Sequence, residues 1–173
     1  MRWGKRIDAT GPTLVRCVVL LLASIGARDQ CRAEPGDERR VAIAPSVEMS
    51  FRWIEPGDFL IGSPDGERRR DADEGPQARV AITRGFYLGV YEVTQRQWQT
   101  VMGENPAAFQ QGDSPERRPV ESVSWNDCAE FLHRLGAVRV GTFRFPTESE
   151  WEYACRAGST TLFYWGDIDE DWE

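Results

Sequence analysis

The sequence predicts an irregular α+β fold, and three observations point to it. Three segments, starting at residues 94, 124 and 147, each carry a helix-capping signal followed by apolar residues at helical spacing. Short runs rich in aromatic and β-branched residues, typical of strands, come before the first of these segments. Long connections punctuated by Pro and Gly join the elements, which argues against a regular layered architecture.

The composition is that of an acidic globular protein. The chain has 173 residues, with 21 Lys and Arg against 28 Asp and Glu, a net charge of -7, 40% hydrophobic residues and seven Trp. A chain with this many apolar and aromatic residues is not disordered throughout, and its length is typical of one domain. The negative charge argues against a protein that coats nucleic acid.

The first 33 residues have the pattern of a cleaved secretory signal peptide. A basic leader precedes the apolar run 17–27, and Cys31-Arg32-Ala33 offers small residues at the two positions that a signal peptidase reads. The run is shorter than the about 20 residues that a membrane-spanning helix needs. A buried core helix or a mis-assigned start codon is the alternative.

Cleavage after Ala33 would remove six basic and two acidic residues, which leaves 15 against 26 and a net charge of -11. We therefore predict a secreted or periplasmic product with no stable membrane anchor.

The rest of the chain divides into a linker and a domain. Residues 34–48 are polar and rich in charge, so we expect a linker, with the domain over 49–173. Met49–Ile54 and Phe59–Gly62 flank Pro56-Gly57 and predict a hairpin. After a solvated loop at 64–77, further extended segments are expected at 79–83, 85–93 and 142–145.

Each helix has predicted start and stop signals. The capping pairs are Thr94 with Gln97, Ser124 with Asp127, and Thr147 with Glu150, and left-handed terminators are expected at Gly103, Gly136 and Gly158. One aromatic-anchored face of each helix should pack on a core, through Trp98, Trp125 and Trp151 respectively. Glu152 and Arg156 should form an exposed pair one turn apart.

Two cysteines, Cys128 and Cys155, remain after removal of the leader. In an oxidising compartment they either pair with each other or find other partners. A mutual disulfide would stabilise the fold by about 3–4 kcal/mol in the chain-entropy model.

Four stretches, in order, resemble one known family. They are Phe51-Arg52-Trp53-Ile54-Glu55-Pro56-Gly57-Asp58-Phe59-Leu60-Ile61-Gly62-Ser63, then Tyr87-Leu88-Gly89-Val90-Tyr91-Glu92-Val93-Thr94, then Pro119-Val120 with Val123-Ser124-Trp125-Asn126-Asp127, and Arg144-Phe145-Pro146-Thr147-Glu148-Ser149-Glu150-Trp151-Glu152-Tyr153-Ala154. The fourth is the most specific because it is long and its residue types are unusual together. Over about residues 49–166 the chain resembles the formylglycine-generating enzyme, or sulfatase-modifying factor, domain.

This resemblance implies a C-type-lectin-like, irregular sulfatase-modifying-factor fold. Enzymes of the family oxidise a cysteine in a Cys-x-Pro-x-Arg segment of a sulfatase to formylglycine, with dioxygen and a copper ion held by two thiolates, and calcium supports their fold. Soft sulfur ligands suit Cu(I). Sulfatase polypeptides are the implied partners.

The family's catalytic cysteine pair follows a Gly-Gly-Ser-Trp-like stretch that has no counterpart before Glu173. The domain therefore resembles the N-terminal portion of the family fold, apparently truncated, and is expected to be inactive as such. We assign no catalytic, cofactor-binding or metal-binding residue in this chain, although the family implies copper and calcium. Cys155 resembles a structural cysteine of the family, and a structural role is favoured for both thiols. The alternative is a non-catalytic lectin-like binding or structural module.

The other candidate residues have structural explanations. Asp167, Asp169 and Asp171 alternate like calcium ligands, but Trp172 stands where such a loop needs Gly, so we expect a solvated tail. His133 has no second His and should be an exposed helix residue. Thr147, Glu148 and Glu150 are explained by helix capping and by the helix dipole. No phosphate-binding loop, nucleophile elbow or His-containing triad is present in the sequence.

Overall fold

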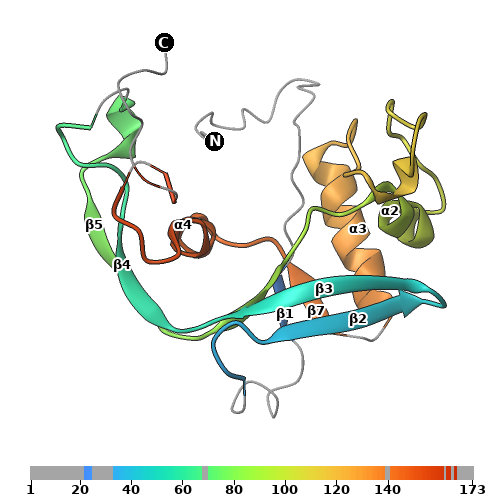
Figure 1. The fold of residues 1–173 in the computed structure, drawn as a ribbon, viewed down its shortest axis with the longest axis horizontal. Helices are drawn as coiled ribbons and strands as arrows, with labels where there is room; N and C mark the ends of the chain where they lie inside the picture. The colour runs from blue at the N-terminus through green and yellow to red at the C-terminus, as the bar shows by residue number, and fades with distance from the viewer. Residues whose placement is uncertain are drawn as a thin grey trace.

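The computed structural model describes residues 33–67, 70–138, 141–161, 163, 164 and 166, and the backbone of 22–24 (Figure 1). The expected α+β class is confirmed, with a five-stranded sheet in the order β2-β3-β6-β1-β7 and a separate two-stranded sheet, β4-β5. The strands are β1 (Leu22–Ser24), β2 (Glu38–Ala44), β3 (Val47–Ile54), β4 (Gly57–Ile61), β5 (Ala78–Ile82), β6 (Phe86–Gly89) and β7 (Thr142–Arg144). The α-helices are α2 (Gln95–Met102), α3 (Trp125–Ala137) and α4 (Glu148–Arg156), and two short 3-10 helices are η1 (Ala72–Glu74) and η2 (Pro115–Arg117).

The centre of the larger sheet follows from alternation in β3. Val47, Met49, Phe51 and Trp53 are buried, and the residues between them are exposed or half-buried. This period of two is what a strand with one face on a core requires. β3 pairs antiparallel with β2 on one side and with β6 on the other.

The far end of the sheet is joined through β1. β1 pairs antiparallel with β6 and also antiparallel with β7, so β6 and β7 run parallel to each other with one strand between them. Among the described strands, β7 has no other neighbour in the sheet. Apart from Ala33, which packs against the core at its edge, the remaining residues of the predicted signal peptide lie outside the described part of the chain, and cleavage stays a prediction.

The expected linker at 34–48 is wrong for most of its length. β2 occupies Glu38–Ala44, and β3 already begins at Val47. Val41 and Ile43 are buried and face the same core as β3. The abundance of charge in this segment concealed a short alternation of apolar and polar residues.

The predicted hairpin of β3 and β4 is also wrong. Both strands exist, but β3 pairs with β2 and β6, whereas β4 pairs with β5. The chain passes from Ile54 to Gly57 without reversing and enters a second sheet. Figure 1 shows β4 and β5 continuing away from the end of β3 and curving around α4.

The predicted helix starts are confirmed. Thr94, Ser124 and Thr147 each close a complete capping box with the residue three positions on. α2 ends at Gly103 in the left-handed region as expected. α3, however, runs one residue beyond Gly136. α4 ends at Arg156, and its left-handed cap is Ala157 in place of the expected Gly158. Within the described residues, no helix is long and apolar enough to cross a bilayer.

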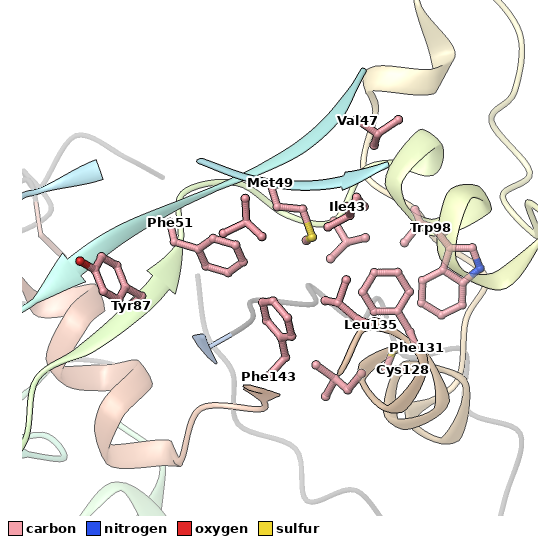
Figure 2. Close-up of a cluster of buried hydrophobic side chains, with 14 of the residues drawn as sticks. Ile43, Val47, Met49, Phe51, Tyr87, Trp98, Cys128, Phe131, Leu135 and Phe143 are labelled. Atoms are coloured by element: carbon pink, nitrogen blue, oxygen red, sulfur yellow. The ribbon is translucent and has the colours of Figure 1, made fainter. Parts of the chain in front are cut away.

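We use the name helical core for the buried cluster between the larger sheet and helices α2 and α3. Trp98 on α2 stacks on Phe131 of α3, with ring centroids 5.0 Å apart and planes 4° from parallel. Phe51 on β3 meets Phe143 on β7 at 5.8 Å. Figure 2 shows these rings gathered with Met49 between the sheet and the two helices. Each fully buried side chain of this size contributes about 1.5–3 kcal/mol, so burial dominates the stability of this region.

We use the name α4 layer for β4, β5 and α4. Its apolar cluster is smaller and centres on Ile82 together with Phe86 of β6. Phe59 and Tyr153 pack against this cluster, and their ring centroids lie 5.4 Å apart. No residue of α4 is fully buried. The expected aromatic anchor Trp151 is half-buried, and Tyr153 makes the ring contact instead.

Candidate functional site

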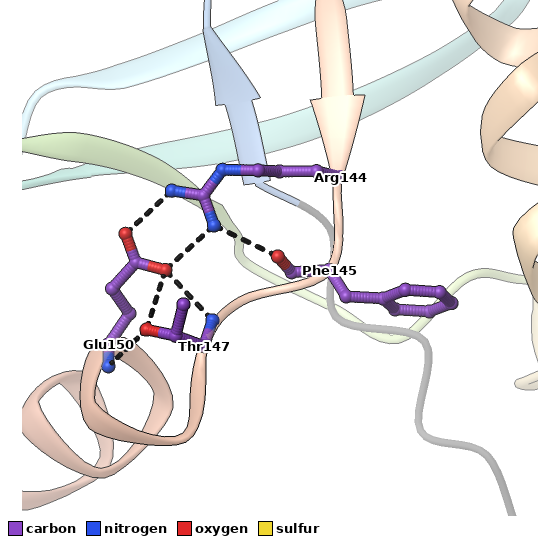
Figure 3. A network of polar contacts seen from close by, with 4 residues as sticks. All are labelled: Arg144, Phe145, Thr147 and Glu150. Atoms are coloured by element: carbon purple, nitrogen blue, oxygen red, sulfur yellow. Dashed lines mark hydrogen bonds and ion pairs between the residues drawn. The ribbon is translucent and has the colours of Figure 1, made fainter.

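Arg144 and Glu150 form the tightest polar contact of the segment with the most specific sequence pattern. The two Arg144 Nη atoms donate to the two Glu150 carboxylate oxygens at 2.7 and 2.6 Å (Figure 3). Arg144 also donates to the carbonyl of Phe145 at 2.9 Å. Such a bidentate pair is strong and directional.

Glu150 has a second role as the capping residue of α4. It accepts hydrogen bonds from the amide of Thr147 at 2.8 Å and from its hydroxyl at 3.0 Å, as predicted for the capping box. Hydrogen bonds from Arg144, followed by those from Thr147, lower the pKa of Glu150 to about 2. The same pair raises the pKa of Arg144. A carboxylate held ionised in this way is a poor proton donor at neutral pH, which agrees with the structural interpretation of Glu150.

The first and fourth family-like segments meet at Gly62. The Gly62 amide donates to Glu152 Oε1 at 3.0 Å, and Arg156 donates to the Gly62 carbonyl at 2.9 Å. Arg156 also binds Glu152 at 2.8 Å, as the predicted pair one turn apart. Both side chains of this pair are about four-fifths buried, contrary to the expected exposed position.

The backbone at Gly62 allows no larger residue without strain. Gly62 has φ +85°, and a Cβ atom there would lie 2.3 Å from the carbonyl oxygen of Glu74. The adjacent Ser63 is buried, and its hydroxyl donates to the Glu74 carboxylate at 2.8 Å. Arg70 donates to the Ser63 carbonyl at 3.2 Å. The loop expected to be merely solvated is therefore tied to α4 through this corner.

The second and third family-like segments meet beside α2. Thr94 and Pro119 form an isolated antiparallel bridge, and the Val120 amide donates to the Val93 carbonyl at 2.9 Å. The four segments that carry the sequence resemblance are therefore joined in two pairs, the first with the fourth and the second with the third.

Gln95 is a buried polar residue that sequence reasoning missed. It is 2% exposed, donates to the Phe109 carbonyl at 3.2 Å and accepts from Asn105 at 3.0 Å. Asn105 in turn accepts from the Ala107 amide at 3.1 Å. This network orders the long connection between α2 and α3. The only sequence signal for it is the position of Gln95 directly after a helix cap.

The two cysteines occupy different regions. Cys128 is fully buried on α3 within the helical core, and Cys155 is exposed on α4. No disulfide joins them. The described residues hold no group of three or more His, Cys, Asp or Glu side chains placed to bind a metal.

Copper of the kind that the family implies needs two thiolates on one ion. The two thiols that the structure describes do not fit that requirement, because Cys128 lies inside a packed core and Cys155 lies on the surface of a helix in a different layer. The calcium candidates Asp167, Asp169 and Asp171 fall outside the described residues. His133 is exposed, as predicted.

One hollow lies on the larger sheet, within the described part of the chain. A hollow of about 10 Å³ beside β3 and β6 is lined by side chains that include Phe51, Tyr91 and Gln97. That volume accommodates about one water molecule and no substrate side chain.

Aromatic surface is more prominent. Trp125, expected to face the core, is 48% exposed and stacks on Phe145 at 5.5 Å. Tyr91 and Phe109 are exposed to 73% and 66%. Phe131, one turn and a half further along α3, takes the core position instead of Trp125.

The sequence and the fold are similar to those of known proteins. Residues 42–173 match the sulfatase-modifying factor enzyme 1-like domain family. The chaperone protein LppX of Paenibacillus barcinonensis is 32% identical over 121 residues, which cover 50% of this chain and 42% of LppX. The formylglycine-generating enzyme of Mus musculus is 28% identical over 162 residues, which cover 65% of this chain and 41% of the enzyme.

Among solved structures, PvdO from Pseudomonas aeruginosa has a TM-score of 0.67 and 27% identity, covering 82% of this chain and 58% of PvdO. The chain spans less than half the length of these two curated relatives. Since the family match covers three-quarters of the residues and includes all four converging segments, this chain belongs to the sulfatase-modifying factor enzyme 1-like domain family.

Proposed function

We propose that this protein supplies the N-terminal scaffold of a formylglycine-generating-type domain and does not itself oxidise cysteine. The observation that carries the proposal is the separation of its two described thiols, with Cys128 enclosed in the helical core and Cys155 exposed on α4. A Cu(I) ion shared by two thiolates requires both sulfur atoms in one coordination sphere.

The scaffold itself is well defined. The family-like segments hold one another through Gly62 with Glu152 and through Val93 with Val120. Polar groups at these junctions satisfy backbone atoms rather than face a cavity. We infer a C-type-lectin-like fold in which these junctions shape the domain.

The leader and the family support a proposal for the biological setting. The leader supports a periplasmic or secreted location, and the family supports a sulfatase polypeptide with a Cys-x-Pro-x-Arg segment as the partner. The acidic charge opposes a nucleic-acid partner. Copper and calcium belong to the family chemistry, and neither is assigned to a residue of this chain.

An oxidation assay tests the proposal. The purified chain is incubated with a Cys-x-Pro-x-Arg peptide, Cu(I), dioxygen and a thiol reductant, and the aldehyde product is measured by mass spectrometry. A formylglycine-generating enzyme serves as the positive control. We expect no aldehyde above the level without protein. Aldehyde above that level would contradict the proposal, and its loss in Cys155→Ser but not in Ser149→Ala, a half-buried position on the same helix, would assign the activity to the Cys155 thiol.

The second candidate is a non-catalytic lectin-like binding module. The Trp125–Phe145 stack supports it, because Trp125 is 48% exposed on a partly buried Phe145 and offers an aromatic face on which another molecule can pack. The relative LppX is named a chaperone protein, which supports a binding role as the second candidate.

A binding measurement with an unfolded sulfatase polypeptide distinguishes this candidate. Under the second candidate, Trp125→Ala weakens binding at least about tenfold, because aromatic residues dominate binding hot spots. Tyr91→Ala, at an exposed aromatic residue in the loop after β6, is the matched control and keeps the wild-type affinity. Equal binding by both variants would exclude the Trp125 surface as the binding site.

A further inference from the structure

β6 and β7 do not pair with each other, and the position between them is a feature of the sheet that the proposed function leaves unexplained. We call this position the gap between β6 and β7. Three residues of the predicted leader, Leu22–Ser24, fill this gap as β1. Figure 1 shows β1 beside β7 under the helices, far in the sequence from both of its neighbours. The sheet order makes β1 the only described strand that joins β7 to the other strands.

Signal cleavage would remove the same residues that the sheet uses as its strand β1. Cleavage after Ala33 would separate Leu22–Ser24 from the domain. Backbone groups of β6 and β7 that β1 now pairs with would then lack partners, and unpaired strand edges bind other strands readily.

We propose that the gap between β6 and β7 is a strand-acceptor site, occupied by leader residues 22–24 in the unprocessed chain and opened for peptide main chain when the leader is removed. This inference does not depend on the proposed function, because it concerns the sheet and not the thiols. Its recognition mode is the addition of a strand, in which main-chain hydrogen bonds supply the affinity.

The walls of the site support the proposal. Ala23 lies in register with Tyr87 on one side and with Phe143 on the other. Both aromatic residues are buried, and Phe143 is anchored in the helical core by its contact with Phe51. The Tyr87 hydroxyl is buried and finds no hydrogen-bond partner among the described residues.

The register also defines the occupant. The occupant runs antiparallel to both neighbours, and its pairing extends over Leu22–Ser24 against Thr142–Arg144. Leu, Ala and Ser at these positions are small or apolar and carry no charge. We therefore expect an extended, uncharged segment, and the leader is the segment of this chain that the structure places there.

The border strand β7 has supports of its own. Arg144 is held by Glu150, and Phe143 packs in the helical core. These contacts can keep β7 near its position when β1 leaves, so the site stays bordered on both sides. The loss of β1 is therefore expected to appear as weaker protection of β7 amides, with the remainder of the core intact.

Hydrogen exchange on the full chain tests the first half of the proposal. Ala23→Pro removes an amide and cannot sit between two paired neighbours. We expect exchange at Thr142–Arg144 to accelerate at least about tenfold, because a strand edge opens locally more readily than a paired strand. Amides of the β2–β3 ladder are the internal control and keep their rates. Ala23→Gly, which retains the amide, stays near wild type. Unchanged β7 protection in Ala23→Pro would overturn the proposal.

A second experiment tests whether the site accepts a peptide once the leader has been removed. It starts from the folded full-length chain. A site for a specific protease is inserted between Asp29 and Gln30, and the protein is cut after folding and washed. The probe is a fluorescent peptide of residues 20–26 with flanking Lys for solubility. We expect saturable binding to the cut protein, no binding to the uncut protein, and no binding of the peptide with Pro in place of Ala23.

Equal binding to cut and uncut protein would overturn the proposal, as would absence of binding. A cut protein that becomes dimeric, with β7 amides still protected, would assign the site to a second copy of the chain instead of the leader. Aldehyde formation in the oxidation assay bears only on the proposed function and leaves both of these measurements unaffected.

Discussion

The helical core and the α4 layer are held together by different forces. In the helical core, aromatic and aliphatic side chains such as Trp98 and Phe131 are almost completely withdrawn from water. In the α4 layer the helix buries no residue completely and is fixed by charged hydrogen bonds at its two ends, Arg144 with Glu150 and Arg156 with Gly62. The comparison teaches that one chain can combine a region stabilised by burial with a region stabilised by directional polar contacts, and that the two should respond to different perturbations.

Phe131→Ala gives the largest expected effect. It removes a fully buried ring that stacks on Trp98 and leaves a cavity, so the free energy of unfolding should fall by about 3–5 kcal/mol. Urea unfolding monitored by circular dichroism measures it. Trp125→Ala on the same helix is the matched control, with an expected loss of about 1 kcal/mol because Trp125 is half-exposed. Similar losses in the two variants would show that the core does not depend on this stack.

Gly62→Ala should disturb the α4 layer and spare the helical core. The added Cβ would meet the Glu74 carbonyl and require a left-handed conformation, at a cost of about 2 kcal/mol. Hydrogen exchange should become faster in α4 and in the loop after β4, with protection of α3 unchanged. Gly66→Ala is the control, since a Cβ there meets nothing within 4 Å. Loss of protection in α3 as well would mean that the two regions unfold together.

Glu150 should make the α4 layer sensitive to acid. Its folded-state pKa of about 2 lies below the ordinary value of 4.5, so the carboxylate stabilises the fold at neutral pH, and this contribution is lost as pH falls from about 4.5 to 2. Because Arg144 is half-exposed and water screens the pair, we expect about 1–2 kcal/mol.

The unfolding free energies of wild type and Glu150→Gln, measured between pH 7 and pH 2, provide the test. The advantage of wild type should shrink steadily below pH 4.5. A difference between the two proteins that stays constant with pH would rule out ionisation of Glu150 as its source.

The smallest effect is expected at Cys155. Cys155→Ser alters an exposed atom on α4 and should change the unfolding free energy by no more than about 0.5 kcal/mol. Cys128→Ser places a hydroxyl in the helical core and should cost about 1–3 kcal/mol, which makes it the contrasting variant. Thermal unfolding with and without reductant measures both. A large loss in Cys155→Ser would indicate that this thiol bonds to another part of the protein.

The predictable parts of the fold were those encoded locally. Capping at Thr94, Ser124 and Thr147 depends on residues three positions apart, and all three boxes are present. The pairing of strands depends on distant residues. Pro56-Gly57 resembles a reversing turn, yet the chain continues into a second sheet because the partner of β4 is β5.

The errors in the helices and in the site have related causes. Trp125 occupies the first turn of α3, at the border of the apolar stripe, where it stacks on Phe145 instead of entering the core. The contact of Gly62 with Glu152 joins residues 90 positions apart, and nothing in either local sequence announces the other. The assignment of the family succeeded because it used the order of four segments and did not require their contacts.

The Gly62–Glu152 contact also sets an order of events during synthesis. The loop around Ser63 emerges from the ribosome long before α4. The Gly62 amide cannot bind its partner until Glu152, 90 residues later, has been synthesised. Domains that depend on such distant closures fold slowly and expose unfinished loops on the way. Nascent chains that stop short of residue 152 should therefore carry an open, protease-accessible segment after β4, while chains only slightly longer conceal it.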